Sequence, residues 1–239
     1  MGSQGIDQQS IQQSVDELRA ADLASGELKG SLRRVVDAIR VVFAADGAGV
    51  MLLDDQQALH YVGATDGRAA AFEAAQEETG EGPCVDSLIN DTDVATDDLV
   101  ADSRWPLLTS QISDLGVRAV LGVPLRLGPT TIGSLNVYYT APHPWHEGDV
   151  AAVDSHARIV EELLGLAVLS RQRSIIVDQL TQALENRVMI ERAVGVIMAT
   201  TDLDAVRAFN ELRLRARSER RRVSELAEEV LLARRFDPR

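Results

Sequence analysis

The spacing of apolar residues changes along the chain, and each change predicts a different kind of secondary structure. Between residues 11 and 44, apolar side chains recur three and four positions apart, which predicts helices that separate near Ser25 and Gly26. Stretches rich in β-branched and aromatic residues flank turn sequences at 47–64 and again at 117–139, and each predicts a β-hairpin. Hairpins mixed with helices indicate an α+β fold.

Beyond residue 147 the apolar positions alternate three and four apart, which is typical of the seam of a coiled coil. The spacing falters at Arg171 and Ser174 and then resumes. The pattern fits either a helix that packs on its own sheet or a long signalling helix in a homodimer. We expect the second, a parallel homodimer built on residues 149–188. The seam consists of Val150, Val153, Ala157, Val160, Leu164, Ala167, Leu180 and Leu184.

Three short amphipathic helices are predicted at the C-terminal end. Each has one apolar stripe, and helices of this kind pack into a small all-α bundle. The stripes contain Ile190, Val194 and Ile197 in the first helix, Val206, Phe209, Leu212 and Ala216 in the second, and Val223, Leu226 and Val230 in the third.

The charge of the chain is divided unevenly between its two parts. The formal net charge is −13, but residues 171–239 hold 14 arginines against 11 acidic residues. Seven of these arginines lie between Arg207 and Arg222, where only Glu211 and Glu219 oppose them. A basic segment at one end of an acidic chain suggests a nucleic-acid surface in that segment.

The C-terminal pattern resembles the ANTAR domain, an RNA-binding antiterminator module. The resemblance rests on Ile190, Ala193, Gly195, Met198, Ala208, Phe209, Leu212, Arg213, Ala216 and Ala227. It implies that this end of the chain binds RNA. One departure is Val194, which stands where this family usually has lysine.

Three further motifs resemble a GAF domain of the kind that precedes ANTAR domains in actinobacterial regulators. They are Gly-Glu-Gly-Pro-Cys-Val-Asp at 80–86, Asp-Ser-Arg-Trp-Pro at 102–106, and two apolar strand sequences at 121–125 and 132–138. The resemblance implies a central antiparallel sheet with flanking helices. It also implies a sensor whose loops enclose a pocket.

These observations divide the chain into four parts. We expect an N-terminal flexible or helical segment at 1–27, a GAF-like sensor at 28–168, a coiled-coil connector at 169–184 and an ANTAR domain at 185–239.

The middle of the chain supplies the apolar residues for a possible ligand pocket. An apolar lining with a few polar groups is the usual form of a small-molecule site, but the same side chains could simply fill a second layer of core. The candidates are Phe72, Cys84, Val85, Leu88, Leu99, Trp105, Leu108 and Ile112. Cys84 follows Gly-Pro at a helix start, where its thiol pKa would fall; a small buried hydrophobe is the alternative.

No constellation in the sequence indicates catalysis. The four histidines lack the spacing of a metal site, and no glycine-rich phosphate loop follows a strand. We therefore expect a non-enzymatic protein without metal or cofactor. No apolar run is long enough to span a membrane, which favours a cytoplasmic location.

The candidate RNA contacts are the arginines of the basic segment and its flanks. They are Arg192, Arg207, Arg213, Arg217, Arg220, Arg221 and Arg222. Guanidinium groups bind phosphates and stack on the unpaired bases of hairpin loops. The sequence thus favours a signal-responsive regulator that binds RNA hairpins and promotes antitermination. The alternatives are a helix-turn-helix DNA-binding protein and a protein-interaction scaffold. A helix-turn-helix requires a tight turn before the third helix, and the connector Ser-Glu-Arg-Arg-Arg at 218–222 fits such a turn less well.

Overall fold

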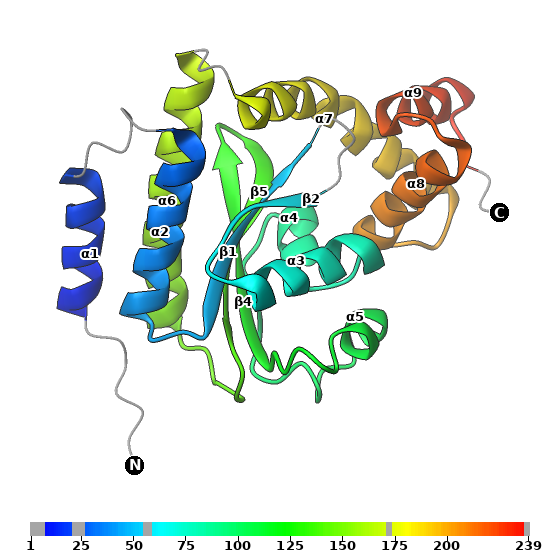
Figure 1. Cartoon of the computed structure of the whole chain (residues 1–239). Helices are drawn as coiled ribbons and strands as arrows, with labels where there is room; N and C mark the ends of the chain where they lie inside the picture. The colour runs from blue at the N-terminus through cyan, green and yellow to red at the C-terminus, as the bar shows by residue number, and fades with distance from the viewer. Residues whose placement is uncertain (1–7, 21–26, 55–58, 171–173, 237–239) are drawn as a thin grey trace.

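A five-stranded antiparallel sheet forms the centre of the sensor part of the chain (Figure 1). The computed structural model describes residues 8–20, 27–54, 59–170 and 174–236. The strands lie in the order β2-β1-β5-β4-β3. Both predicted hairpins are confirmed, because β1 pairs with β2 and β4 pairs with β5. The strands are β1 (Gly47–Leu53), β2 (Leu59–Ala64), β3 (Val94–Thr96), β4 (Ala119–Leu127) and β5 (Thr130–Tyr139).

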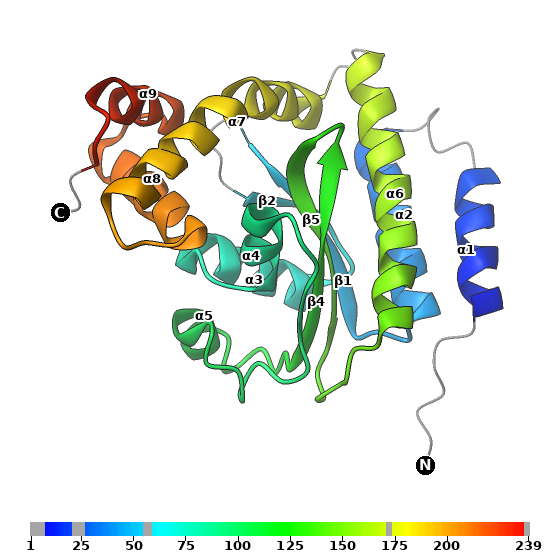
Figure 2. The ribbon, with the colours of Figure 1, turned by 180° about the vertical axis from the view of Figure 1, so that it is seen from behind.

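Helices cover both faces of this sheet (Figures 1 and 2). One face carries α2 (Leu28–Val42) and α6 (Glu147–Leu169), with α1 (Gln8–Ala20) outside them. The other face carries α3 (Gly67–Thr79), α4 (Pro83–Asn90) and α5 (Pro106–Gln111). The α+β architecture expected from the sequence is therefore confirmed. The flexible part predicted for the N-terminal segment lies largely outside the described residues.

Strand alternation decides which side chains meet which helices. On β5, Leu135 and Val137 join the core beneath α2 and α6. Asn136 and Tyr138 point to the opposite side, where Asn136 reaches α3 and Tyr138 joins the core under α3 and α5. The face of β5 toward α2 and α6 is thus mainly apolar, whereas the opposite face carries buried polar groups.

The seam of α6 packs inside the sensor. Val153, Ala157, Val160, Leu164 and Ala167 are buried in one core together with α2 and the sheet. The two flanking positions at 150 and 184 pack against the same core, and Leu180 is part of it. Our interpretation of this seam as a dimer interface was wrong for these side chains, because they pack against the sheet and the helices of their own chain.

The expected continuous helix is also interrupted. Helix α6 ends at Leu169, and α7 (Ile175–Thr200) begins after Ser174, whose Oγ accepts a hydrogen bond from the backbone N–H of Val177 at 3.1 Å. Ser174 is one of the two positions at which the apolar spacing falters; the other, Arg171, lies outside the described residues. The change of register seen in the sequence therefore marks the start of a new helix.

Helix α7 connects the sensor to the C-terminal bundle (Figure 1). Its first half packs on the sensor through Val177, Leu180 and Ala183. Its second half packs on α8 (Ala205–Glu219) and α9 (Val223–Ala233) through Ile190, Ala193 and Ile197. One helix thus belongs to two cores, so the two parts are joined by more than a linker.

Candidate nucleic-acid interface

The seven candidate arginines lie in three different environments. Five are exposed: Arg192 on α7, Arg207 and Arg217 on α8, and Arg220 and Arg222 in the turn before α9. Arg221 is engaged by two carboxylates, with Nη1 3.2 Å from Glu219 and 2.6 Å from Glu229. Arg213 is turned toward the sensor. The predicted cluster is therefore divided between solvent and internal contacts.

Arg213 and Asn210 attach α8 to the C-terminal turn of α3. The Nδ2 of Asn210 donates to the carbonyl oxygen of Gly80 at 2.6 Å, and Nη2 of Arg213 donates to the carbonyl of Glu77 at 3.1 Å. Desolvation lowers the pKa of Arg213 from its ordinary value. Sequence reasoning missed Asn210, since a lone asparagine on a helix carries no signal for a contact so far away in the chain.

Arg215, another arginine of α8, makes its contacts within the bundle. Arg215 pairs with Glu219 at 2.9 Å, and its guanidinium lies 5.3 Å from the ring centre of Phe236.

Val194, at the family's usual lysine position, is buried in the bundle core. Gly195 is exposed, and a Cβ there would meet nothing within 4 Å. No described helix therefore packs closely against this glycine.

The turn between α8 and α9 is shorter than the sequence suggested. It contains only Arg220, Arg221 and Arg222, and Arg220 adopts the left-handed conformation with φ of 53°. A turn of this length is compatible with a helix-turn-helix motif. Turn length therefore does not exclude that alternative, contrary to our expectation.

The helix that follows this turn is acidic. In a helix-turn-helix protein, the second helix of the pair enters the major groove. Here α9 has Glu225, Glu228 and Glu229 exposed, and it contains no basic residue from Val223 to Ala233. Such a helix would be repelled by DNA phosphates.

Two clefts border the junction between sensor and bundle. The smaller, of about 330 Å³, has Asp54, His60 and Glu77 on the sensor side and Arg213, Arg217 and Arg221 on the bundle side. The larger, of about 760 Å³, is lined by Gly80 and Asn210 and extends to Trp105 and Arg207. Arginines of α8 and of the turn after it thus face two acidic residues of the sensor across the smaller cleft.

His60 lies between the two acidic residues on the sensor side of the smaller cleft and contacts both of them. Its Nε2 lies 2.8 Å from Asp54 Oδ2, and its Nδ1 lies 3.1 Å from Glu77 Oε1. The hydrogen bond to Asp54 raises the pKa of His60 most, and the negative charges of both carboxylates raise it further.

The eight residues expected to line a ligand pocket form packed core instead. Phe72, Leu99, Trp105, Leu108 and Ile112 belong to one cluster and Cys84, Val85 and Leu88 to another, and all eight are buried. Of the eight, Trp105 alone borders one of the two junction clefts. The alternative interpretation of these side chains as a second core layer agrees with the structure.

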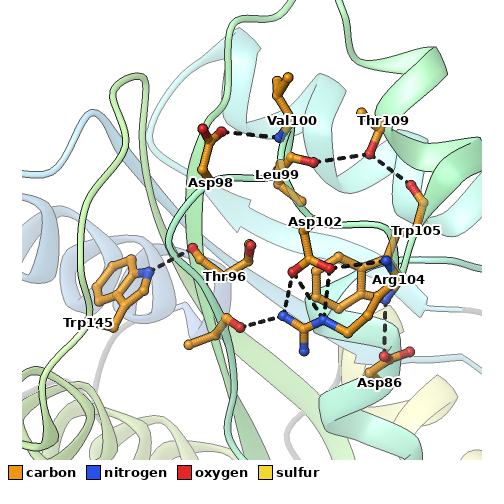
Figure 3. A network of polar contacts seen from close by, with 11 residues as sticks. Asp86, Thr96, Asp98, Leu99, Val100, Asp102, Arg104, Trp105, Thr109 and Trp145 are labelled. Carbon is orange, nitrogen blue, oxygen red and sulfur yellow. Dashed lines mark hydrogen bonds and ion pairs between the residues drawn. The ribbon is translucent and has the colours of Figure 1, made fainter.

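Two of the GAF-like motifs meet in space through Trp105 (Figure 3). The indole Nε1 donates to Asp86 Oδ2 at 3.0 Å, and the guanidinium of Arg104 lies 4.1 Å from the ring centre. Arg104 is held in turn by Asp102 at 2.6 Å and by the carbonyl of Ala95 at 2.7 Å. These residues fix the loop before α5 to β3 and to α4.

A buried polar cluster lies between α3 and the sheet. The carboxylate of Glu73 accepts hydrogen bonds from Asn136 Nδ2 at 2.9 Å and from Gln76 Nε2 at 3.1 Å, and Cys84 Sγ lies 3.5 Å away. Burial raises the pKa of Glu73 to about 7. Burial and the nearby carboxylate raise the pKa of the Cys84 thiol, which disfavours the reactive thiolate.

Comparisons with known proteins agree with the two-part architecture. The GAF domain model matches residues 27–164, and the ANTAR domain model matches residues 178–231. A search of the curated proteins finds no significant match. Within the described residues, no helix combines the length and apolar character required to cross a membrane.

Solved structures share the fold of the sensor. The GAF domain of a phosphoenolpyruvate-protein phosphotransferase from Coxiella burnetii is 17% identical with a TM-score of 0.55, covering 69% of this chain and 96% of that one. The corresponding domain from Acinetobacter is 16% identical with a TM-score of 0.54, covering 72% and 100%. Free methionine-R-sulfoxide reductase from Neisseria meningitidis is 16% identical with a TM-score of 0.51, covering 67% and 89%.

The fold and the site define a regulator with a sensor domain attached to a helical output domain. The chain belongs to the GAF domain family and carries an ANTAR domain, of the RNA-binding antitermination class, after it.

Proposed function

We propose that this protein binds structured RNA through the exposed arginines of its ANTAR domain and promotes transcription antitermination. The observation that carries the proposal is the position of Arg217, Arg220 and Arg222. All three are exposed, and all lie at the end of α8 or in the following turn, inside the ANTAR match. Guanidinium groups grouped in this way suit phosphate contacts and stacking on unpaired bases.

The sensor would supply the control of this activity. The GAF domain is joined to the output through α7 and through the α3–α8 contact, so a change in the sensor can reach the arginines. A small molecule is the expected input; the predicted pocket is filled with side chains, which leaves the junction clefts as its candidate sites. A regulator of this kind would act in the cytoplasm, without catalysis.

The test is a titration of the full chain with a pool of RNA hairpins that share one stem and have randomised loops. Arg217→Ala with Arg220→Ala should weaken binding at least about tenfold, equivalent to about 1.4 kcal/mol. The slope of log affinity against log salt should fall by about 0.7 for each single-stranded RNA phosphate that the variant no longer binds. Arg34→Ala with Arg40→Ala removes two exposed arginines from α2 and is the matched control.

Two results would count against the proposal. Equally weakened binding in both double variants would show that net charge alone governs the interaction. Unchanged hairpin affinity in the α8 variant would remove this end of α8 from the site.

Binding to duplex DNA is the second candidate, because the three-residue turn before α9 fits a helix-turn-helix motif. The acidic surface of α9 argues against it. A duplex of equal length in the same titration separates the two, and tighter binding to the duplex than to the hairpins would favour DNA.

A further inference from the structure

The contact between α8 and the sensor uses acceptors that resemble those of RNA. Asn210 and Arg213 donate to the carbonyl oxygens of Gly80 and Glu77, which belong to the C-terminal end of α3. Carbonyl groups at the end of a helix have no partner within the helix and carry partial negative charge. To a guanidinium group, this end of α3 resembles a pair of phosphate oxygens.

The contacting residues are part of one longer stripe on α8. Asn210, Arg213 and Arg217 are spaced three and four apart, so they lie on the same side of the helix. The first two face the sensor, whereas Arg217 is exposed. The sensor therefore covers one half of the stripe and leaves the other half open.

Gly80 leaves the space that the side chains of α8 fill at this contact. It has φ of +68°, and a Cβ on it would lie 2.9 Å from Asn210 Oδ1 and 3.0 Å from Arg213 Nη2. The carbonyl to which Asn210 binds is that of Gly80 itself. A side chain at this position would have to displace α8 or the groups it presents.

The contact is incompletely satisfied, which suits a reversible one. The Oδ1 of Asn210 is buried and accepts no hydrogen bond from any described residue. Arg213 is largely desolvated and donates its hydrogen bond to a neutral carbonyl, and the nearby charges of Glu77 and Asp54 only partly offset this desolvation. Buried polar groups left without full partners cost free energy, so release of α8 would let water donate to Asn210 Oδ1 and let an anionic acceptor bind Arg213.

We propose that the C-terminal turn of α3 competes with RNA phosphates for Asn210 and Arg213, so that this structure is the closed, low-affinity state of the regulator. The inference rests on the proposed function and adds its regulation. Opening frees the covered half of the stripe and joins it to Arg217 and Arg220.

The turn is also held from inside the sensor, which gives a signal a route to it. Gln76, one helical turn before Gly80, accepts a hydrogen bond from the backbone N–H of Cys84 at 3.0 Å and donates to Glu73. A Cβ on Gly82 would lie 2.2 Å from Gln76 Oε1. A change in this buried cluster would therefore move the residues to which α8 is attached.

The test compares two glycines with the same backbone conformation. Gly80→Ala introduces a methyl group into the contact, whereas Gly116→Ala, also at φ of +68°, adds one where nothing lies within 4 Å. Both changes carry the same left-handed strain, so the difference between them reports the contact with α8. If Gly80→Ala impairs folding, Gly80→Asn replaces it, because asparagine tolerates this conformation better.

Two measurements are made on each full-length variant. Hydrogen exchange in peptides covering 77–82 and 205–219 reports whether α8 has left the sensor. A titration with the pool of RNA hairpins reports affinity. Gly80→Ala should exchange faster in both peptides and bind RNA at least about tenfold more tightly than the parent chain, while Gly116→Ala should match the parent in both.

The outcomes separate this inference from the proposed function. Faster exchange with unchanged RNA affinity would show that the contact opens without exposing an RNA surface and would overturn the inference alone. Unchanged exchange would show that Gly80 does not control the contact, with the same consequence. Absence of RNA binding in the opened variant would overturn the proposed function itself.

Discussion

Replacing Leu164 with alanine should lower the free energy of unfolding by about 2–5 kcal/mol, the range found for leucine-to-alanine changes in packed cores. Leu164 lies on α6 with none of its surface exposed, packed in the core shared with α2 and the sheet. Its truncation removes apolar burial and leaves a cavity that the surrounding strands cannot close. Denaturant titration followed by circular dichroism measures the loss.

Leu166 provides the control on the same helix. It is 53% exposed, so Leu166→Ala should change the free energy of unfolding by less than about 0.5 kcal/mol. If Leu164 instead served a dimer interface, the unfolding midpoint of the parent chain would depend on protein concentration, and the truncation would lower the molecular mass in light scattering. A loss of stability independent of concentration is the result expected from the structure.

The α6 seam shows where sequence reasoning succeeded and where it stopped. The three-and-four spacing correctly predicts a helix with one apolar stripe, and the interruption near Ser174 coincides with a helix start. The same spacing fits a helix against a sheet and a helix against a second copy, because both bury a single stripe. Only the presence of β4 and β5 beneath Val153 and Val160 decides between them.

The hairpins and the three C-terminal helices were predictable because their signals are local. Turn sequences, β-branched residues and capping side chains act within a few positions of the chain. Asp204, for example, accepts a hydrogen bond from the backbone N–H of Arg207 at 2.8 Å and starts α8.

The candidate site was only partly predictable because its contacts are distant in sequence. Composition indicates a basic segment, but it does not separate Arg217, which is exposed, from Arg213, which faces a carbonyl 136 positions away. Arg221 lies next to Arg220 and Arg222, yet two glutamates engage it. Which arginines remain open depends on packing that no local pattern contains.

The stability of the sensor should fall by about 2–3 kcal/mol between pH 5 and pH 8 through one group, Glu73, at about 1.36 kcal/mol for each pKa unit. In the folded chain, burial raises the pKa of this carboxyl from its ordinary value of 4.5 to about 7. Between these two values the folded state holds the proton and the unfolded state has lost it. The contribution of Glu73 is therefore full below about pH 4.5, declines as the pH rises, and levels off above about 7.

Glu73→Gln should remove this decline. The variant also alters the hydrogen bonds with Gln76 and Cys84, which shifts its stability by a constant amount. For that reason, the quantity to compare is the change between pH 5 and pH 8 in each protein, measured by urea titration. Glu78→Gln, which removes an exposed carboxylate from the same helix, controls for net charge. If the parent chain and Glu73→Gln lose the same stability over this interval, the Glu73 carboxyl is not a buried group that takes up its proton near neutral pH.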